Sequence, residues 1–226
     1  MTYTIEGTPL PIAICKLTEG ESIITERGGM SWMSGGMEMK TNTQGGLGKA
    51  FGRMISGESM FMNEYTCKTG EGMIAFASSF PGSIIPFEIS ASNTIIAQKT
   101  AFLAATSGVS LSMHFNKKFG GGLFGGEGFI MQKLTGDGTA FVEIDGHVVE
   151  YTLEAGQSMI IDTGHLAAMT EGVSLDIQTV KGVTNMLFGG EGMFNTVLKG
   201  PGKIWLQTMP AVNLANSLFG YMPKGK

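Results

Sequence analysis

Short runs of β-branched and large apolar residues, bounded by glycines, recur along the whole chain. Each run is too short for a helical period and is typical of strands joined by tight turns. The clearest runs are 22–25, 73–77, 94–97, 139–144 and 203–208. Near the C-terminus, Leu214 and Leu218 stand four residues apart and Gly220 follows, which predicts a short helix over 212–219. The pattern therefore predicts an all-β protein with a short C-terminal helix or tail.

Two motifs recur with one common offset. The hexapeptide Leu-Phe-Gly-Gly-Glu-Gly occupies 123–128 and again 187–192, and Gly-Val-Ser-Leu occupies 108–111 and again 172–175. Both pairs are 64 residues apart. Because the spacing between the motifs is kept, the chain contains a repeated unit of about sixty residues.

A third, more diverged copy precedes these two. Residues 22–25 lead to 33–39, then 54–59 and then 70–72, and the offset to the middle copy falls from 72 to 69 to 66, as two three-residue insertions would produce. The sequence therefore predicts a single domain, 1–226, made of three repeats. Their approximate bounds are 12–80, 82–145 and 146–209, with a tail over 211–226. Three such units can close around a pseudo-three-fold axis, with Gly57, Gly126 and Gly190 in equivalent turns.

Composition narrows the classes of partner and the cell compartment. Charged residues make up 15% of the 226 residues and the net charge is −4, so no basic surface for a nucleic acid is expected. The two cysteines, Cys15 and Cys67, are expected to be buried thiols in a reducing compartment, which favours the cytoplasm. The N-terminal residues have neither a secretory signal nor a presequence pattern. No uncharged apolar run reaches the ~18 residues of a transmembrane segment.

The segments 3–7, 27–33 and 123–128, together with the triplicated unit, resemble the altered-inheritance-of-mitochondria protein family over essentially the whole chain. Bacterial members of this family were long filed as a domain of unknown function. The resemblance implies a fold related to the tryptophan RNA-binding attenuation protein, with three β-sandwich or double-stranded β-helix-like modules. Members in eukaryotes, a mitochondrial biogenesis family, are implicated in mitochondrial membrane organisation. RNA binding does not follow from the fold.

Several residue types that could carry chemistry also have a structural explanation. The glycine-rich loops could hold phosphate, but Glu127 and Glu191 would repel it and no Gly-Lys-Ser or Gly-Lys-Thr follows. The three histidines occupy non-equivalent positions in their repeats, which favours surface or turn roles over a metal site; they are His114, His147 and His165. Methionines at 30, 33, 37 and 39 could bind Cu(I), but methionines fill strands in every repeat, which favours core packing.

Paired carboxylates are the remaining catalytic candidates. Glu143, Asp145, Asp137 and Asp162 could supply them, but a carbohydrate cleft needs aromatic platforms and only Trp32 and Trp205 are present. Solvated turns explain these acids better. The sequence thus predicts no catalytic residues and no cofactor, and the protein is not expected to be an enzyme.

One acidic residue recurs in all three units, as Glu58, Glu127 and Glu191. If the three carboxylates converged near an axis, their repulsion would raise a pKa or attract Mg²⁺ or Ca²⁺. The favoured alternative is that each accepts hydrogen bonds from its own glycine turn.

Cations beside apolar residues mark two equivalent loop segments, 49–54 and 116–124. These could form a packed loop or an edge that docks a partner or touches a membrane surface. The candidate interaction surface consists of Phe51, Phe119, Leu123, Phe124, Leu187 and Phe188. The leading hypothesis is a non-enzymatic scaffold or protein-interaction protein, a homo-oligomer or a partner of another protein. The alternative is a small-ligand or divalent-cation-binding protein with its site near the pseudo-three-fold axis.

Overall fold

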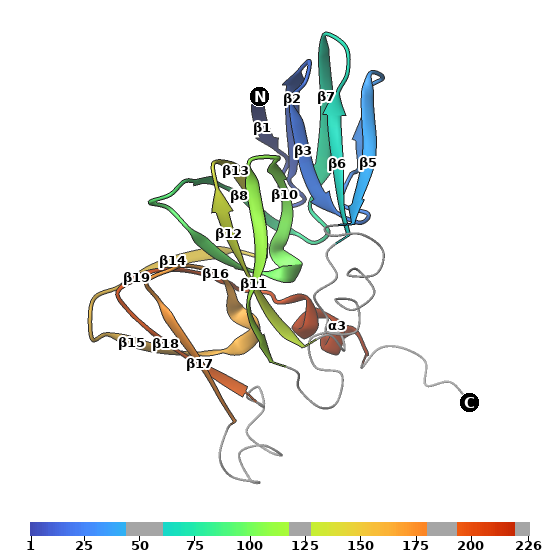
Figure 1. Cartoon of the computed structure of the whole chain (residues 1–226). Coiled ribbons are helices and arrows are strands. Elements are labelled where there is room, and N and C mark those ends of the chain that lie inside the picture. The colour runs from blue at the N-terminus through green and yellow to red at the C-terminus, as the bar shows by residue number, and fades with distance from the viewer. Residues whose placement is uncertain (44–60, 118–127, 180–193, 220–226) are drawn as a thin grey trace.

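The computed structural model describes residues 1–43, 61–117, 128–179 and 194–219 (Figure 1). Most of these residues lie in β-strands, which confirms the all-β prediction. The helix predicted over 212–219 is also confirmed, as α3 (Ala211–Phe219). None of the helices in the described part of the chain is long and apolar enough to cross a membrane.

The strands fall into three successive groups along the chain. The first group is β1 (Thr2–Glu6), β2 (Ile12–Thr18), β3 (Ser22–Glu26), β4 (Trp32–Met33), β5 (Met37–Thr43), β6 (Phe61–Cys67) and β7 (Glu71–Ala77). The second is β8 (Gly82–Ile89), β9 (Ile95–Gln98), β10 (Phe102–Thr106), β11 (Val109–Lys117), β12 (Phe129–Gly136) and β13 (Gly138–Asp145). The third is β14 (Val148–Leu153), β15 (Ser158–Asp162), β16 (Leu166–Thr170), β17 (Ser174–Thr179), β18 (Phe194–Lys199) and β19 (Gly202–Gln207). Short 3₁₀ turns, η1 (Lys99–Ala101) and η3 (Thr163–His165), precede β10 and β16.

These strands form four antiparallel sheets, and the two large ones share one strand order. The second sheet runs β5-β6-β3-β10-β13-β8, and the third runs β11-β12-β9-β16-β19-β14, so every label in the third is six higher. The first sheet is β1-β2-β7-β4 and the fourth is β15-β18-β17. Each six-stranded sheet therefore takes three strands from one group and three from the next.

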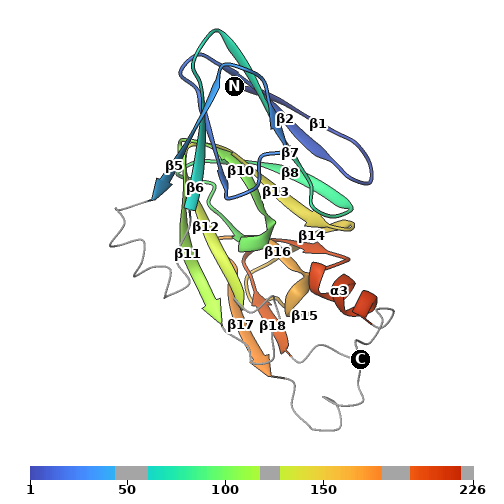
Figure 2. The same ribbon diagram turned by 90° about the vertical axis from the view of Figure 1, so that its right-hand side faces the viewer.

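The sheets lie one after another with a hydrophobic core between each neighbouring pair. The first core joins Cys15 and Ile74 of the first sheet to Phe141 of the second. The middle core packs Phe87 against Trp205, with ring centroids 4.8 Å apart in an edge-to-face contact. A third core lies between the third and fourth sheets. Figures 1 and 2 show the sheet of β1, β2 and β7 at the opposite end of the molecule from the sheet of β15, β17 and β18.

The position between two cores explains the apolar runs of the inner strands. Strand β13 is buried on both faces from Thr139 to Ile144, so its burial is continuous instead of alternating, and only Thr139 and Glu143 interrupt its apolar side chains. Strand β2 belongs to the first sheet and buries only one face, so its burial alternates. The burial pattern of a strand thus indicates whether its sheet has a core on one face or on both.

A hydroxyl group recurs at one place in each strand group. The hydroxyl oxygens of Ser34, Thr106 and Thr170 accept hydrogen bonds from the next antiparallel strand, at 2.9, 3.1 and 3.0 Å. The donors are the backbone N–H groups of Met73, Thr139 and Lys203. Gly138 and Gly202 precede the last two donors with φ of 141° and 148°, and a Cβ there would collide with the threonine hydroxyl. These positions accordingly require glycine.

The sheets form an open series in the described residues, because no hydrogen bonds link the first sheet to the fourth. The expected closure around a pseudo-three-fold axis is not tested by this pairing and stays a prediction.

Candidate functional site

The residues predicted to make contacts with partners lie outside the described residues. This applies to the candidate interaction surface, Phe51, Phe119, Leu123, Phe124, Leu187 and Phe188. It applies also to the repeated acids Glu58, Glu127 and Glu191 and to the repeated turn glycines Gly57, Gly126 and Gly190. The structure does describe the two strands that flank each of these segments.

Each of the three segments connects two strands of one antiparallel hairpin. The pairing of β5 with β6 ends at Thr43 opposite Phe61. The pairing of β11 with β12 ends at Lys117 opposite Phe129, and that of β17 with β18 at Thr179 opposite Phe194. In both views the hairpin ends point towards the lower side of the molecule (Figures 1 and 2). The three glycine-rich segments therefore start from equivalent positions in the fold.

The cationic residue at the end of β11 makes an internal contact. Lys117 Nζ donates a hydrogen bond to the carbonyl oxygen of Ile177 on β17, at 2.7 Å. This bond joins the second hairpin to the third across neighbouring sheets. The ammonium group of Lys117 thus helps to hold two loop-bearing hairpins together.

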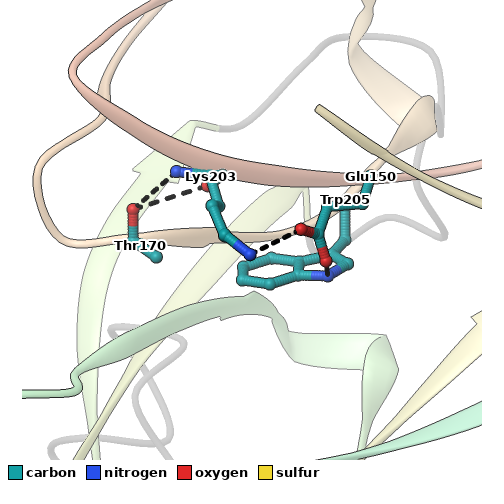
Figure 3. Close-up of polar contacts among 4 residues, drawn as sticks. All are labelled: Glu150, Thr170, Lys203 and Trp205. Carbon is teal, nitrogen blue, oxygen red and sulfur yellow. Dashed lines mark hydrogen bonds and ion pairs between the residues drawn. The ribbon is translucent and has the colours of Figure 1, made fainter. Parts of the chain in front are cut away.

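A polar cluster lies on the third sheet and joins β14, β16 and β19 (Figure 3). Glu150 accepts hydrogen bonds from Lys203 Nζ at 2.6 Å and from Trp205 Nε1 at 2.9 Å. The bond from Lys203 is the main cause that lowers the pKa of Glu150, and the bond from Trp205 acts in the same direction. Because the Trp205 indole is buried and its N–H is bonded, it serves packing between sheets and is not an open platform for a sugar or base. The repeat could have suggested this role, since Trp205 stands 64 residues after the buried Phe141.

The explanation of the four acids as solvated turns is wrong for two of them. Glu143 is buried, and its carboxylate accepts hydrogen bonds from the backbone N–H groups of Ser79 at 2.7 Å and Phe80 at 3.2 Å. Asp145, two residues later on β13, accepts one from the N–H of Ala211 at 3.1 Å, at the start of α3. Packing between distant segments, which no local sequence pattern reports, buries Glu143 and partly buries Asp145.

Burial raises the pKa of both acids. For Asp145 the pKa rises to about 6, chiefly through burial and then through the nearby charge of Glu143, while the bond from Ala211 opposes the rise. For Glu143 burial also raises the pKa, against the bonds from Ser79 and Phe80. Glu143 therefore fastens the segment between β7 and β8, and Asp145 fastens the start of α3. Of the other two acids, Asp137 is exposed in a turn and Asp162 accepts a bond from Gly164 N–H at the start of η3.

Several of the remaining candidates for metal or redox chemistry take part in core packing or in hydrogen bonds. Cys15 and Cys67 are buried, as predicted, and burial raises the pKa of Cys15 to about 12. His165 Nδ1 lies 2.7 Å from the carbonyl oxygen of Gln207. Met37 lies in the first core and Met30 packs against it, in agreement with core packing, whereas Met33 and Met39 are exposed, so core packing is wrong for those two. Within the described ranges, no three His, Cys, Asp or Glu side chains form a group that could hold a metal ion.

Comparison with known proteins matches this chain to a family model, to a related bacterial protein and to a solved structure. The model of a family described as "Mitochondrial biogenesis AIM24" matches residues 3–209. An uncharacterised protein of Streptococcus pyogenes serotype M6 is 32% identical over 232 residues, covering 99% of this chain and 92% of the relative. A crystal structure of a Streptococcus pyogenes protein, solved by a structural genomics consortium, superposes with a TM-score of 0.80 at 28% identity. That superposition covers 98% of this chain and 99% of the other.

Proposed function

Since this chain belongs to the mitochondrial biogenesis AIM24 family, whose description names no reaction, we propose that it is a non-enzymatic interaction scaffold. Its three tandem β units present related glycine-rich loops to a protein partner. The observation that carries the proposal is the equivalent origin of the loops, each between the paired strands of one hairpin.

The tandem organisation is supported by the strand order and by the sequence repeat together. Strands β2–β7 lie within 12–80, β8–β13 within 82–145 and β14–β19 within 146–209. The second and third sheets keep the same order with labels advanced by six. A repeated unit that keeps its loop motif, Leu-Phe-Gly-Gly-Glu-Gly, over two copies is typical of proteins that use one face for recognition.

The chemistry of the loops fits an apolar contact. Phenylalanine and leucine stand among glycines at 119–126 and 187–190, and aromatic anchors with adaptable backbone are common in protein interfaces. The net charge of −4 gives no general attraction to an anionic surface, so a protein partner is favoured over a charged membrane.

The experiment compares the wild-type protein with a variant in which Leu123, Phe124, Leu187 and Phe188 are all changed to serine. A matched control changes the exposed Tyr151, on β14, to serine. We expect the loop variant to lose a set of co-purifying proteins in quantitative affinity purification, while the control and the melting temperature stay unchanged. Equal partner recovery by all three proteins would refute the proposal.

Two further measurements distinguish this proposal from membrane contact and from binding of a small ligand or cation. Co-sedimentation with neutral and with anionic vesicles tests peripheral membrane contact, and loop-dependent binding there would replace a protein partner by a lipid surface. Native mass spectrometry of protein purified without chelator tests the small-ligand or cation alternative, in which Glu58, Glu127 and Glu191 would hold a divalent ion. A bound mass that disappears when these acids become glutamine would support that alternative.

A further inference from the structure

Strands β4 and β15 each have one unpaired edge and carry large exposed hydrophobic side chains. Strand β4 pairs with β7 alone, and strand β15 pairs with β18 alone. Trp32 and Met33 on β4 are 51% and 37% exposed, and Ile160 on β15 is 67% exposed. Open edges with apolar side chains invite pairing with another strand.

The two inner sheets show what occupies these edges elsewhere in the same fold. In the second sheet β3 pairs with β10, and in the third sheet β9 pairs with β16. The strand order makes β15 the counterpart of β3 and β9, and β4 the counterpart of β10 and β16. The fourth sheet, β17-β18-β15, and the strands β4-β7-β2 of the first sheet are therefore two complementary halves of one six-stranded sheet.

The inner junctions share one register. Ile24 lies opposite Ala105 in the first junction, and Ile96 lies opposite Met169 in the second. Neighbouring pairs follow the same rule, Ile23 with Thr106 and Ile95 with Thr170.

Met33 and Ile160, on the two open edges, can be placed in that register through the residues that they pair with in their own sheets. Met33 lies opposite Ile74 as Ala105 lies opposite Ala140 and Met169 opposite Ile204. Ile160 lies opposite Val197 as Ile24 lies opposite Glu64 and Ile96 opposite Lys133. These correspondences make Met33 the equivalent of Ala105 and Met169, and Ile160 the equivalent of Ile24 and Ile96.

We propose that β15 of one copy of this chain pairs antiparallel with β4 of a second copy, with Met33 opposite Ile160, so that copies associate head to tail. In the same register Trp32 lies opposite Ile161 and Ser34 opposite Met159. This surface is separate from the glycine-rich loops and does not rest on the function proposed for them.

In the completed sheet, the exposed apolar side chains of β4 and β15 also face the hydrophobic cores of the two copies. Ile96, the counterpart of Ile160, is fully buried in the third core, and Ala104 and Ala168, the counterparts of Trp32, are fully buried too. In the joined sheet, Ile160 lies on the face of Ile74, next to the first core of the second copy. Trp32 lies on the face of Ile161, next to the third core of the first copy. Pairing thus removes from water the apolar side chains that the single chain leaves exposed.

The partner is a second copy because the edges of one chain do not meet. The first and fourth sheets stand at opposite ends of the series, in both views (Figures 1 and 2). Because the proposed contact joins β15 of one copy to β4 of the next, it is heterologous and builds rings or filaments instead of closed symmetric dimers.

The test uses two single variants of the full chain, Met33→Lys and Ile160→Lys, and sedimentation velocity over a concentration series. A buried lysine at either position would oppose pairing, while each variant keeps one intact edge. We expect the wild-type protein to associate, and each variant alone to sediment as a monomer. A mixture of the two should form a 1:1 dimer that grows no further, because its one remaining junction would place two lysines together. Met39→Lys, on the outer edge of β5, is the control and should associate like the wild type.

The register has its own test by disulfide trapping. Met33→Cys mixed with Ile160→Cys should give a cross-linked dimer on mild oxidation, whereas Met33→Cys mixed with Met159→Cys, whose side chain points to the other face, should not. A wild-type protein that stays monomeric at every concentration would overturn the proposal. So would a variant mixture that stays monomeric while the wild type associates, or equal cross-linking of the two cysteine mixtures. Loss of partner binding by the loop variant would not affect any of these outcomes.

Discussion

At the scale of single residues, Asp145 links protonation to stability. Its folded pKa is about 6, against 3.8 for an ordinary aspartate, so the folded state binds the proton more tightly. The contribution of Asp145 to the free energy of unfolding is therefore fully present below pH ~4 and is lost as the pH rises to ~6. We expect Asp145→Asn, which keeps an acceptor for Ala211 N–H, to remove this loss and to stabilise the protein at pH 7 by about 1–3 kcal/mol. Chemical denaturation at pH 4, 5, 6 and 7 measures the difference.

The control for this change is Asp137→Asn, in an exposed turn. Its stability should follow the wild type at every pH. If Asp145→Asn and the wild type differ by the same amount at pH 4 and pH 7, the raised pKa does not contribute to stability.

At the scale of elements, α3 is the one α-helix in the described residues and attaches to the strands through few groups. Asp145 accepts the Ala211 N–H, and Val212 and Leu214 are half-buried. Leu218, by contrast, is 55% exposed. We expect truncation after Pro210 to cost about 1–2 kcal/mol, or about 2–4 °C in melting temperature per kcal/mol. Truncation after Phe219 keeps the helix and is the matched control, and equal melting of both would show that α3 contributes nothing.

At the scale of the whole molecule, the serial arrangement of sheets predicts a gradient of protection. Strands β10, β13, β9 and β16 lie centrally in sheets that have a core on each face, whereas β1 and β17 are edges of the end sheets. Local opening of an end sheet disrupts one core, while opening of an inner sheet disrupts two. We expect native-state hydrogen exchange of dilute protein to be at least about tenfold slower in the central strands, about 1.4 kcal/mol. Uniform protection throughout the described strands would mean that all four sheets unfold as one unit.

Much of the architecture was determined by the sequence. The all-β class and the terminal helix follow from hydrophobic periods that depend on neighbours within a few residues. The bounds of the second and third repeats follow from motifs that keep an offset of 64, and strands β2–β19 fall inside the three predicted repeats. The buried cysteines were also predictable, because they stand within apolar strands.

Only the tertiary structure decided how the repeats combine. The pairing of Ile24 with Ala105 joins strands about eighty residues apart, and nothing in the local pattern of either strand specifies its partner. The same long-range packing buries Glu143 and partly buries Asp145, both of which the sequence suggests to be turn acids, and it leaves one edge of β4 and one edge of β15 without a neighbouring strand. Local periodicity fixes which face of a strand is apolar, but the neighbour that covers this face is chosen by packing between distant segments.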